Sequence, residues 1–375
     1  MAESGPPAFI GPIVTKMESG QGWPDSRSGG SGGGGSELAQ LGRIRLRAAQ
    51  SPGSALRLGI GDDCALLTAR AGEELAVTTD LSIAGRHFRL DWHPAEAVGH
   101  RTLARGLSDL AAMGARPIAA FLSLGLPANL VQNAKTRSAA KAKPWVDRYL
   151  DGFLALARAH GVPLAGGDLA ESPVAVADIV LAGAVRRGRA LLRSGAQPGD
   201  LLYVTGSLGG AAAGLARLGE LAAAAGPATE SRTGALRIPK NIEAALAPHL
   251  YPQPRIAQGL RLARRRLATA ALDLSDGLST DLAHLCAESG VAAEVEAAAL
   301  PIFPGATQAQ ALHGGEDYEL LFSAALYVRV PRAIAGVPVT RIGRLMRRRA
   351  GRPAVTLLTA QGAAPLEPRG WEHFS

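Results

Sequence analysis

Aspartates beside glycine or hydroxyl residues recur in both halves of the chain, each where a run of apolar residues ends. They lie in the segments GIGDDCALL, VTTD, LSDLAAMGA, AGGD and LDLSDGLSTDL, as Asp62, Asp63, Asp80, Asp109, Asp168, Asp273, Asp276 and Asp281. Each aspartate taken singly fits a helix cap or a turn. Ligand sites of α/β folds, however, form in the crevice outside the strand ends, so we expect these carboxylates to converge. Carboxylates at short range stay ionised only beside cations, and the set therefore indicates a cation site.

Magnesium is the cation that this pattern favours. Hard oxygen ligands without a cluster of Cys and His argue against a transition metal. Magnesium binds through a few carboxylates together with substrate phosphates, so the implied ligand is a nucleoside triphosphate. Thr78 and Thr79, just before Asp80, could add oxygens to the metal shell, although threonine is also common in strands for its β propensity. Asp109 lies one turn before the predicted end of a helix, where either a metal or a neighbouring arginine would compensate its unfavourable charge.

No familiar nucleotide-binding loop accounts for ATP. The chain has no G-x-x-x-x-G-K-[ST] segment, and VTGSLGGAAAG (204–214) lacks the G-x-G-x-x-G spacing, which disfavours a Rossmann dehydrogenase. Arg193 and His87 are the isolated cations most suited to phosphate, although a lone Arg or His is more often structural. In GGEDYELLF, Glu316 and Asp317 either contact a substrate or form the turn into a strand.

Short apolar strands alternate with amphipathic helices from Glu37 onward, which predicts an α/β fold rather than an all-α or all-β one. We expect strands at 74–80, 118–126, 177–185, 201–206, 269–273 and 318–323, and a strand pair at 338–344 and 353–358. We expect helices at 95–113, 145–160, 210–225, 254–266 and 279–289. The first two helices stop at Gly114 and Gly161, where glycine can adopt the left-handed conformation that closes a helix.

The length of the chain, a Gly/Ser-rich segment and a basic turn predict a tail and two domains. With 375 residues, of which 47% are hydrophobic, the chain can form two cores. Residues 1–36 contain SRSGGSGGGGS at 26–36 and are expected to form a disordered, Gly/Ser-rich tail. We place an N-terminal domain at 37–188 and a C-terminal domain at 189–375, with the boundary in the basic turn after Val185.

Charge and composition narrow the partners and the location. A net charge of +8 and a pI near 10.0 suit a nucleic-acid-binding protein, but stacking aromatics and known binding modules are missing, so we expect no nucleic acid. The positive charge would instead favour the approach of anionic substrates. Without a long apolar run or a signal peptide we expect no membrane span. The two cysteines lack the spacing of a zinc site or a disulfide framework, which favours a reduced, cytoplasmic location.

Taken in order, the motifs resemble those of thiamine-monophosphate kinases. They are GIGDDCALL, TTD followed by GRHF, LSDLAAMGA, GGD, RSGAQPGDLLYVTG, LDLSDGL, GGEDYEL and the terminal GWEHF, spanning residues from about 40 to the C-terminus. That family is part of an ATP-binding superfamily named after aminoimidazole ribonucleotide synthetase. The resemblance implies a two-domain α/β fold, with an N-terminal domain that binds ATP and magnesium and forms a homodimer through its sheet.

The resemblance also implies roles for individual residues. The implied magnesium ligands are Asp63, Thr78, Thr79, Asp80, Asp109, Asp168, Asp273 and Asp276. The implied ATP contacts are Gly167, Asp168, Arg193 and Ser275, and the implied thiamine monophosphate contacts are His87, Glu316 and Trp371. The implied reaction is direct transfer of the γ-phosphoryl group to the acceptor phosphate, without a covalent protein nucleophile. The alternatives are another ATP-dependent enzyme of the superfamily with a different small acceptor, or a non-catalytic protein that binds nucleotide or nucleic acid.

Overall fold

The computed structural model describes residues 37–48, 55–60, 64–131, 143–226, 236, 238 and 243–371. The predicted tail at 1–36, together with Asp62 and Asp63, lies outside these residues. The N-terminal half contains α1 (Glu37–Ala48), β1 (Leu56–Leu58), β2 (Leu66–Leu67), β3 (Glu73–Ile83), α2 (Ala95–Ala112), β4 (Arg116–Leu126), α3 (Ala128–Val131), α4 (Trp145–His160), β5 (Leu164–Glu171) and β6 (Val176–Arg186). The C-terminal half contains β7 (Leu201–Thr205), α5 (Gly210–Ala225), α6 (Glu243–Leu250), α7 (Ile256–Arg265), β8 (Ala270–Asp273), α8 (Leu278–Ser289), β9 (Val291–Glu296), α9 (Gln308–His313), β10 (Leu320–Ala324), β11 (Ala333–Ile334), β12 (Val337–Arg347), β13 (Val355–Thr359) and β14 (Gly362–Pro365).

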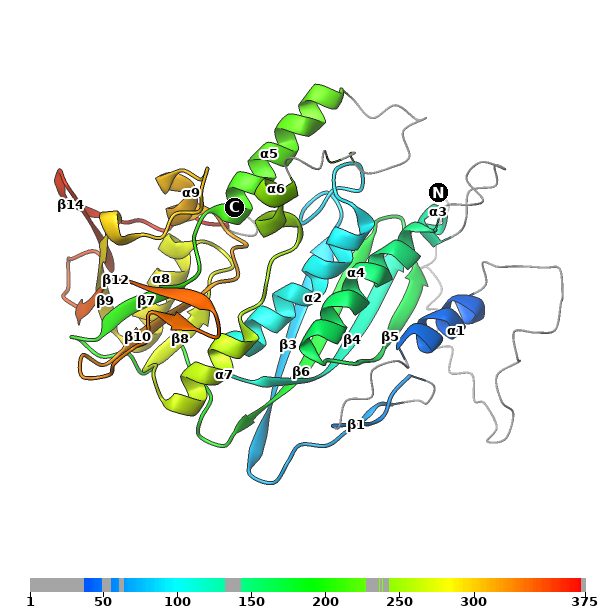
Figure 1. Cartoon of the computed structure of the whole chain (residues 1–375), viewed down its shortest axis with the longest axis horizontal. Coiled ribbons are helices and arrows are strands. Elements are labelled where there is room, and N and C mark those ends of the chain that lie inside the picture. Colours follow the sequence, from blue (N-terminus) through cyan, green and yellow to red (C-terminus); the bar gives the residue numbers. More distant parts are fainter. Residues whose placement is uncertain are drawn as a thin grey trace, which may run out of the picture.

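The N-terminal sheet has the strand order β3-β6-β4-β5, and α2 and α4 lie along one of its faces (Figure 1). Side chains alternate along the edge strand β3, as a strand requires. Thr78 and Asp80 contact α2, whereas Leu75, Val77 and Leu81 point the other way and are 54%, 65% and 46% exposed. The face of the sheet opposite α2 is therefore open and apolar along this strand.

The C-terminal sheet has the order β14-β13-β9-β12-β7-β10-β8, with β11 added on β12. The expected pairing of 338–344 with 353–358 is wrong, because β9 lies between the two strands, antiparallel to β12 and parallel to β13. The six-residue sequence VAAEVE of β9 is rich in alanine and carries no strong strand signal, so the sequence did not reveal it. The predicted α/β class is confirmed in both halves.

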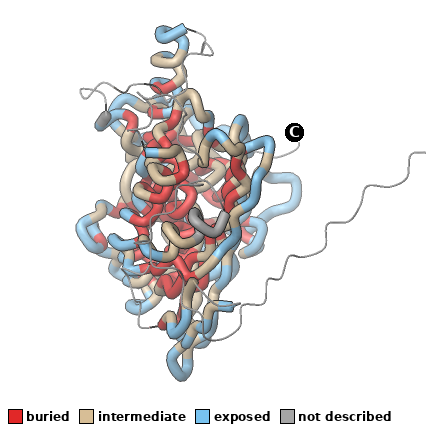
Figure 2. Tube along the Cα trace, turned by 90° about the vertical axis from the view of Figure 1, so that its right-hand side faces the viewer, coloured by how far each residue is buried: buried red, intermediate tan, exposed pale blue. Residues whose placement is uncertain are grey.

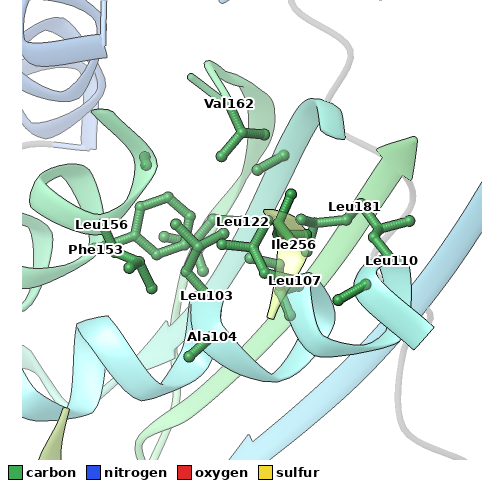
Figure 3. Packing of buried hydrophobic residues seen from close by; sticks show 14 of the residues in the cluster. Leu103, Ala104, Leu107, Leu110, Leu122, Phe153, Leu156, Val162, Leu181 and Ile256 are labelled. Carbon is green, nitrogen blue, oxygen red and sulfur yellow. The ribbon is translucent and has the colours of Figure 1, made fainter. Parts of the chain in front are cut away.

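One hydrophobic core passes through both halves, with α2 at its centre. It joins Leu107 of α2 and Leu181 of β6 to Ile256 of α7 and Phe322 of β10, and all four are buried (Figure 3). Helix α4 approaches α2 very closely, since a Cβ at Gly152 would lie 1.8 Å from the carbonyl oxygen of Glu96. The buried parts of the chain trace are concentrated in the interior of the molecule (Figure 2). Packing of this kind fixes the orientation of the two sheets.

Several local predictions hold at the ends of elements. Gly114 and Gly161 have φ values of +64° and +61°, which confirms the expected left-handed helix ends. Strand β10 begins at Leu320, two residues later than expected, because Glu316 and Tyr318 have positive φ values of 69° and 50° and cannot belong to a strand. No helix in the described part of the chain is both long and apolar enough to cross a bilayer.

Candidate active site

A cavity of about 680 Å³ lies between the two halves of the molecule. Its walls come from β3 and the turn after it, from α2, from the loop after β8, from the loop before β10 and from the C-terminal segment 369–371. The residues singled out from the sequence that line it are Asp80, His87, Asp109, Asp273, Ser275, Asp276, Glu316 and Trp371. Segments far apart in the sequence thus meet at one place, since both Asp80 and Trp371, 291 positions apart, are among the lining residues.

Asp109 and Asp273 form the acidic centre of this cavity. The Thr78 hydroxyl donates a hydrogen bond to Asp109, and the Ser108 hydroxyl donates to Asp273 Oδ2 at 2.7 Å. Burial, and next the negative charge of Asp273, raises the pKa of Asp109 to about 7. Burial likewise raises the pKa of Asp273, which is only 5% exposed. Two neighbouring carboxylates, one half-buried and one buried, carry more negative charge than the hydroxyl donors can offset.

Arginines compensate this charge only in part. Arg105 of α2 forms an ion pair with Asp80 at 3.1 Å, yet burial still raises the pKa of Asp80. The positive charge of Arg193 lowers the pKa of Asp109, but the net shift is upward. The sequence left open whether a metal or a neighbouring arginine compensates the charge of Asp109. An arginine is nearby, but its charge does not cancel the upward shift of the pKa. The remaining negative charge suits a bound cation.

Asp281 fixes the backbone of the loop that carries Asp276, a structural role that was not predicted from the sequence. Its Oδ2 accepts hydrogen bonds from the backbone N–H groups of Asp276 and Gly277, both at 3.0 Å. Burial, and next the charges of Asp273 and Asp276, raises the pKa of Asp281 to about 8. The backbone of the loop after β8 is thereby fixed, and the Asp276 side chain lines the cavity.

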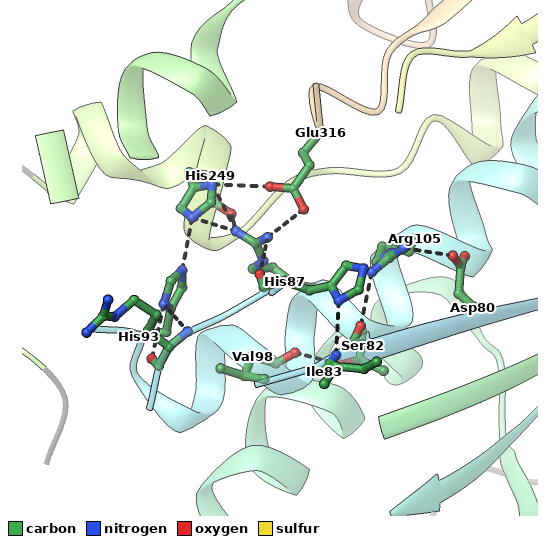
Figure 4. Close-up of polar contacts among 12 residues, drawn as sticks. Asp80, Ser82, Ile83, His87, His93, Val98, Arg105, His249 and Glu316 are labelled. Carbon is green, nitrogen blue, oxygen red and sulfur yellow. Dashed lines mark hydrogen bonds and ion pairs between the residues drawn. The ribbon is translucent and has the colours of Figure 1, made fainter. Parts of the chain in front are cut away.

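His87, Glu316 and Trp371 line the same cavity. His87 Nδ1 accepts the backbone N–H of Ile83 at 3.1 Å, and the Glu316 carboxylate forms an ion pair with Arg101 at 2.6 Å (Figure 4). The Trp371 side chain is half exposed, and its backbone N–H donates to the carbonyl oxygen of Asp276 at 3.1 Å. Substrate contacts inferred from sequence therefore lie beside the acidic residues.

Arginines on the cavity wall were missed from the sequence. Arg86, Arg105 and Arg369 all line the cavity. A signal was available for two of them, since Arg86 lies inside GRHF and Arg369 directly precedes GWEHF. Arginine is well suited to phosphate, which it can bind through two parallel hydrogen bonds.

Several other residues singled out from the sequence do not line this cavity in the single chain. Gly167 and Asp168 on β5 line a second cavity of about 460 Å³, whose walls include Ile44, Phe121 and Leu150. Strand β5 is at the opposite edge of the sheet from β3, so Asp168 does not meet Asp80. Thr79 is exposed on the open face of the sheet, in the row next to that of Asp168. Arg193 lines neither cavity.

No three acidic, His or Cys side chains of the described segments are grouped closely enough to hold a metal ion by themselves. Magnesium does not require such a group, since it keeps several waters and takes phosphate oxygens as further ligands. The donors present are hard oxygens, and their raised pKa values show that positive charge would be favourable there. The residues therefore fit magnesium as part of a metal–nucleotide complex.

Comparison with known proteins places the chain in a family. Residues 61–186 match the family model "AIR synthase related protein, N-terminal domain", and residues 197–345 match the corresponding C-terminal domain. Thiamine-monophosphate kinase of Salmonella typhimurium is 40% identical over 301 residues, which are 76% of this chain and 83% of that protein. The chain belongs to the thiamine-monophosphate kinase family. The resemblance inferred from the motifs is confirmed.

Solved structures of thiamine-monophosphate kinases share the fold. The enzyme from Stenotrophomonas maltophilia K279a is 38% identical, with a TM-score of 0.67 over 86% of this chain and 96% of that one. AaThiL complexed with AMPPCP and TMP is 28% identical, with a TM-score of 0.65 over 90% of this chain and 97% of that one. The predicted two-domain, aminoimidazole ribonucleotide synthetase-like fold of the thiamine-monophosphate kinase family is thus confirmed, whereas the boundary at 188–189 stays a prediction.

Proposed function

We propose that this protein transfers the γ-phosphoryl group of ATP to the phosphate of thiamine monophosphate, giving thiamine diphosphate and ADP. Family membership supports the reaction, as does the relative whose structure contains AMPPCP and TMP. The observation that carries the proposal is the single cavity in which acidic side chains of both halves meet His87, Glu316 and Trp371. Phosphoryl transfer requires mainly positioning and charge neutralisation, and this cavity offers groups for both.

We assign the magnesium site to the acidic end of the cavity. Asp80, Asp109, Asp273 and Asp276 line it, with Thr78 bound to Asp109, and these residues would hold the metal there. Asp63, Thr79 and Asp168 remain predicted ligands, the first outside the described residues and the other two on the open side of the sheet. Bound magnesium would neutralise charge on the transferred phosphoryl group.

The acceptor needs no protein nucleophile or strong base. A phosphate monoester carries most of its second negative charge at neutral pH, so its oxygen can attack directly. Arg86 and Arg369 on the cavity wall would offset the charge of the acceptor phosphate, while His87, Glu316 and Trp371 would orient the thiamine part. The chain's contribution is therefore orientation and electrostatic stabilisation.

ATP would use residues on both sides of the sheet. Ser275 lines the main cavity, Arg193 influences the pKa of Asp109 and Asp273, and Gly167 and Asp168 line the second cavity. The largely apolar wall of that second cavity suits the flat ring of a base. Assignment of Arg193, Gly167 and Asp168 to ATP stays a prediction.

A homodimer would cover the open face of the N-terminal sheet. Leu75, Val77 and Leu81 are exposed apolar side chains on it, with Thr79 between the last two, and exposed apolar patches mark interaction surfaces. Thr79 and Asp168 lie on the same face and would be enclosed with them. We propose that two copies pair through this face.

The Val77→Asp variant should therefore be monomeric at concentrations where the wild type is dimeric. The variant would place an unpaired carboxylate from each subunit inside the interface, which would weaken association by about 3 kcal/mol or more. Light scattering after size-exclusion chromatography measures the mass. Leu326→Asp, at a position 72% exposed in the C-terminal half, serves as control and should stay dimeric. An unchanged mass for Val77→Asp would refute this pairing.

Product analysis tests the reaction itself. Wild-type protein incubated with ATP, magnesium and thiamine monophosphate should form thiamine diphosphate and ADP in equal amounts, and none with excess EDTA. Parallel reactions with thiamine and with other phosphate monoesters test acceptor choice. ADP formation with another acceptor alone would favour a different enzyme of the superfamily. Salt-sensitive DNA binding without ATP turnover would favour a nucleic-acid role. Absence of nucleic acid and membrane partners and a cytoplasmic location remain predictions.

A further inference from the structure

Arg101 of α2 is a buried arginine that links the two halves of the molecule at the active-site cavity. Only 6% of its surface is exposed. Its Nη2 donates to Glu316 Oε1 at 2.6 Å and to the backbone carbonyl oxygen of His87 at 3.2 Å (Figure 4). A single nitrogen atom thus connects the two proposed acceptor contacts, which come from different halves of the chain. None of the motifs read from the sequence includes Arg101.

The other side of Arg101 is fixed by histidines. Its Nη1 donates to the backbone carbonyl oxygen of His249 at 2.9 Å and lies 2.9 Å from the ring Nδ1. His249 Nε2 in turn lies 3.0 Å from His93 Nε2, and both rings are buried. Burial, and next the charge of Arg101, lowers the pKa of His93 to about 3 and that of His249 well below its usual value. Burial thus disfavours a positive charge on either ring, and the carboxylate that pairs with Arg101 is that of Glu316.

Glu316 depends on this arginine for its orientation. Its backbone has a φ of +69°, and its N–H donates to the carbonyl oxygen of Ser275 at 2.8 Å. The peptide is thereby fixed at one end; at the other, Arg101 binds Oε1 of the carboxylate at 2.6 Å, and His249 Nδ1 lies farther away, 3.6 Å from Oε2. In the described part of the chain, Arg101 is the arginine that forms an ion pair with Glu316. Since the Glu316 side chain is 28% exposed and lines the cavity, this contact sets where a carboxylate oxygen faces the acceptor.

We infer that Arg101 is a positioning residue that sets the separation of Glu316 from His87 and thereby the affinity for the acceptor. The inference rests on the proposed function. A guanidinium can serve both partners because its five N–H donors lie in a rigid plane, whereas the ammonium of lysine is a flexible point charge. Arg101 itself lies outside the residues that line the cavity, so it acts through Glu316 and His87.

The test compares Michaelis constants in Arg101→Met and Arg101→Lys. In Arg101→Met the KM for thiamine monophosphate should rise about tenfold or more, because displacement of a positioning group by about 1 Å weakens binding strongly. Arg101→Lys should recover part of this loss, and the KM for ATP should stay within about twofold in both. If Arg101→Met does not fold, Arg101→Lys decides alone: its KM for the acceptor should still exceed the wild-type value.

Arg255→Met provides a matched control. Arg255 is partly buried and forms an ion pair with the buried Glu319, with Nε 2.6 Å from Glu319 Oε2, and it does not line the cavity. Its loss should lower the melting temperature without changing the KM for the acceptor. A merely structural Arg101 would behave as Arg255 does.

A double-mutant cycle with Glu316→Gln identifies the path of the effect. If Arg101 acts through Glu316, the KM of the double variant should match that of Glu316→Gln within about twofold. Additive effects, an unchanged acceptor KM in the Arg101 variants, or an equal rise in both KM values would each overturn the inference. Wild-type protein that forms no thiamine diphosphate would instead refute the proposed function, and the inference with it.

Discussion

The Asp276→Asn variant should lose about 10³-fold or more in kcat with thiamine monophosphate and ATP, while its free energy of unfolding changes by less than about 1 kcal/mol. Asparagine keeps the shape of the side chain but removes the charge that would hold magnesium. The fold should survive because the backbone of this residue is fixed independently. Its N–H donates to Asp281, and its carbonyl oxygen accepts from Trp371.

Steady-state kinetics at saturating ATP and magnesium measure the loss, and urea titration measures the stability. Asp151→Asn is the matched control. Asp151 lies on α4, outside the cavity, and forms surface ion pairs with Arg47 and Lys143. That variant should keep the wild-type rate. A rate for Asp276→Asn within tenfold of wild type would show that its carboxylate is not needed.

Asp109→Asn should stabilise the magnesium-free protein at pH 8 and abolish its activity. Burial raises the pKa of Asp109 from 3.8 to about 7, so the folded form holds the proton more tightly than the unfolded chain does. The stability linked to this proton is complete below pH 4 and is lost as the pH rises through 7. The full pKa shift corresponds to about 4 kcal/mol of free energy of unfolding. Because neighbouring carboxylates can adjust their positions or take up the proton themselves, we expect the variant to be stabilised by about 2 kcal/mol at pH 8. Asparagine can still accept the Thr78 hydrogen bond.

Urea unfolding in EDTA at pH 8 and at pH 4 checks this expectation. The gain should be present at the higher pH and absent at the lower one, where Asp109 of the wild type is already protonated. Magnesium with an ATP analogue should raise the melting temperature of the wild type more than that of the variant, because ligands stabilise the state that binds them. Asp109→Asn that is less stable than wild type at pH 8 would contradict the account of a charge-strained site.

The sequence predicted which carboxylates approach one another where the strand-end rule applies directly. The rule applies to Asp273, which ends β8, and to Asp276 in the loop after it; Asp80 lies within β3 and Asp109 within α2, and the structure still places all four in one cavity. Their roles as ligands remain predictions. The type of most helices and strands was also predicted, because hydrophobic periodicity is a local property of the chain.

Other features depend on pairings that are not local. Thr79 and Asp168 lie on the open side of the sheet because of strand parity and strand order, which tertiary packing decides. Strand β9 lies between β12 and β13 for the same reason. The ion pair of Arg101 with Glu316 joins residues 215 positions apart. No spacing rule could identify such a contact from one sequence.

We expect acidic side chains of both halves to hold divalent ions against a polyphosphate in the cavity between the halves. The most direct measurement is anomalous diffraction from crystals grown with manganese in place of magnesium and a non-hydrolysable ATP analogue. The account predicts anomalous peaks within about 2.5 Å of carboxylate oxygens from Asp80, Asp109, Asp273 or Asp276. Metal and triphosphate bound elsewhere, with all four carboxylates away from both, would contradict it.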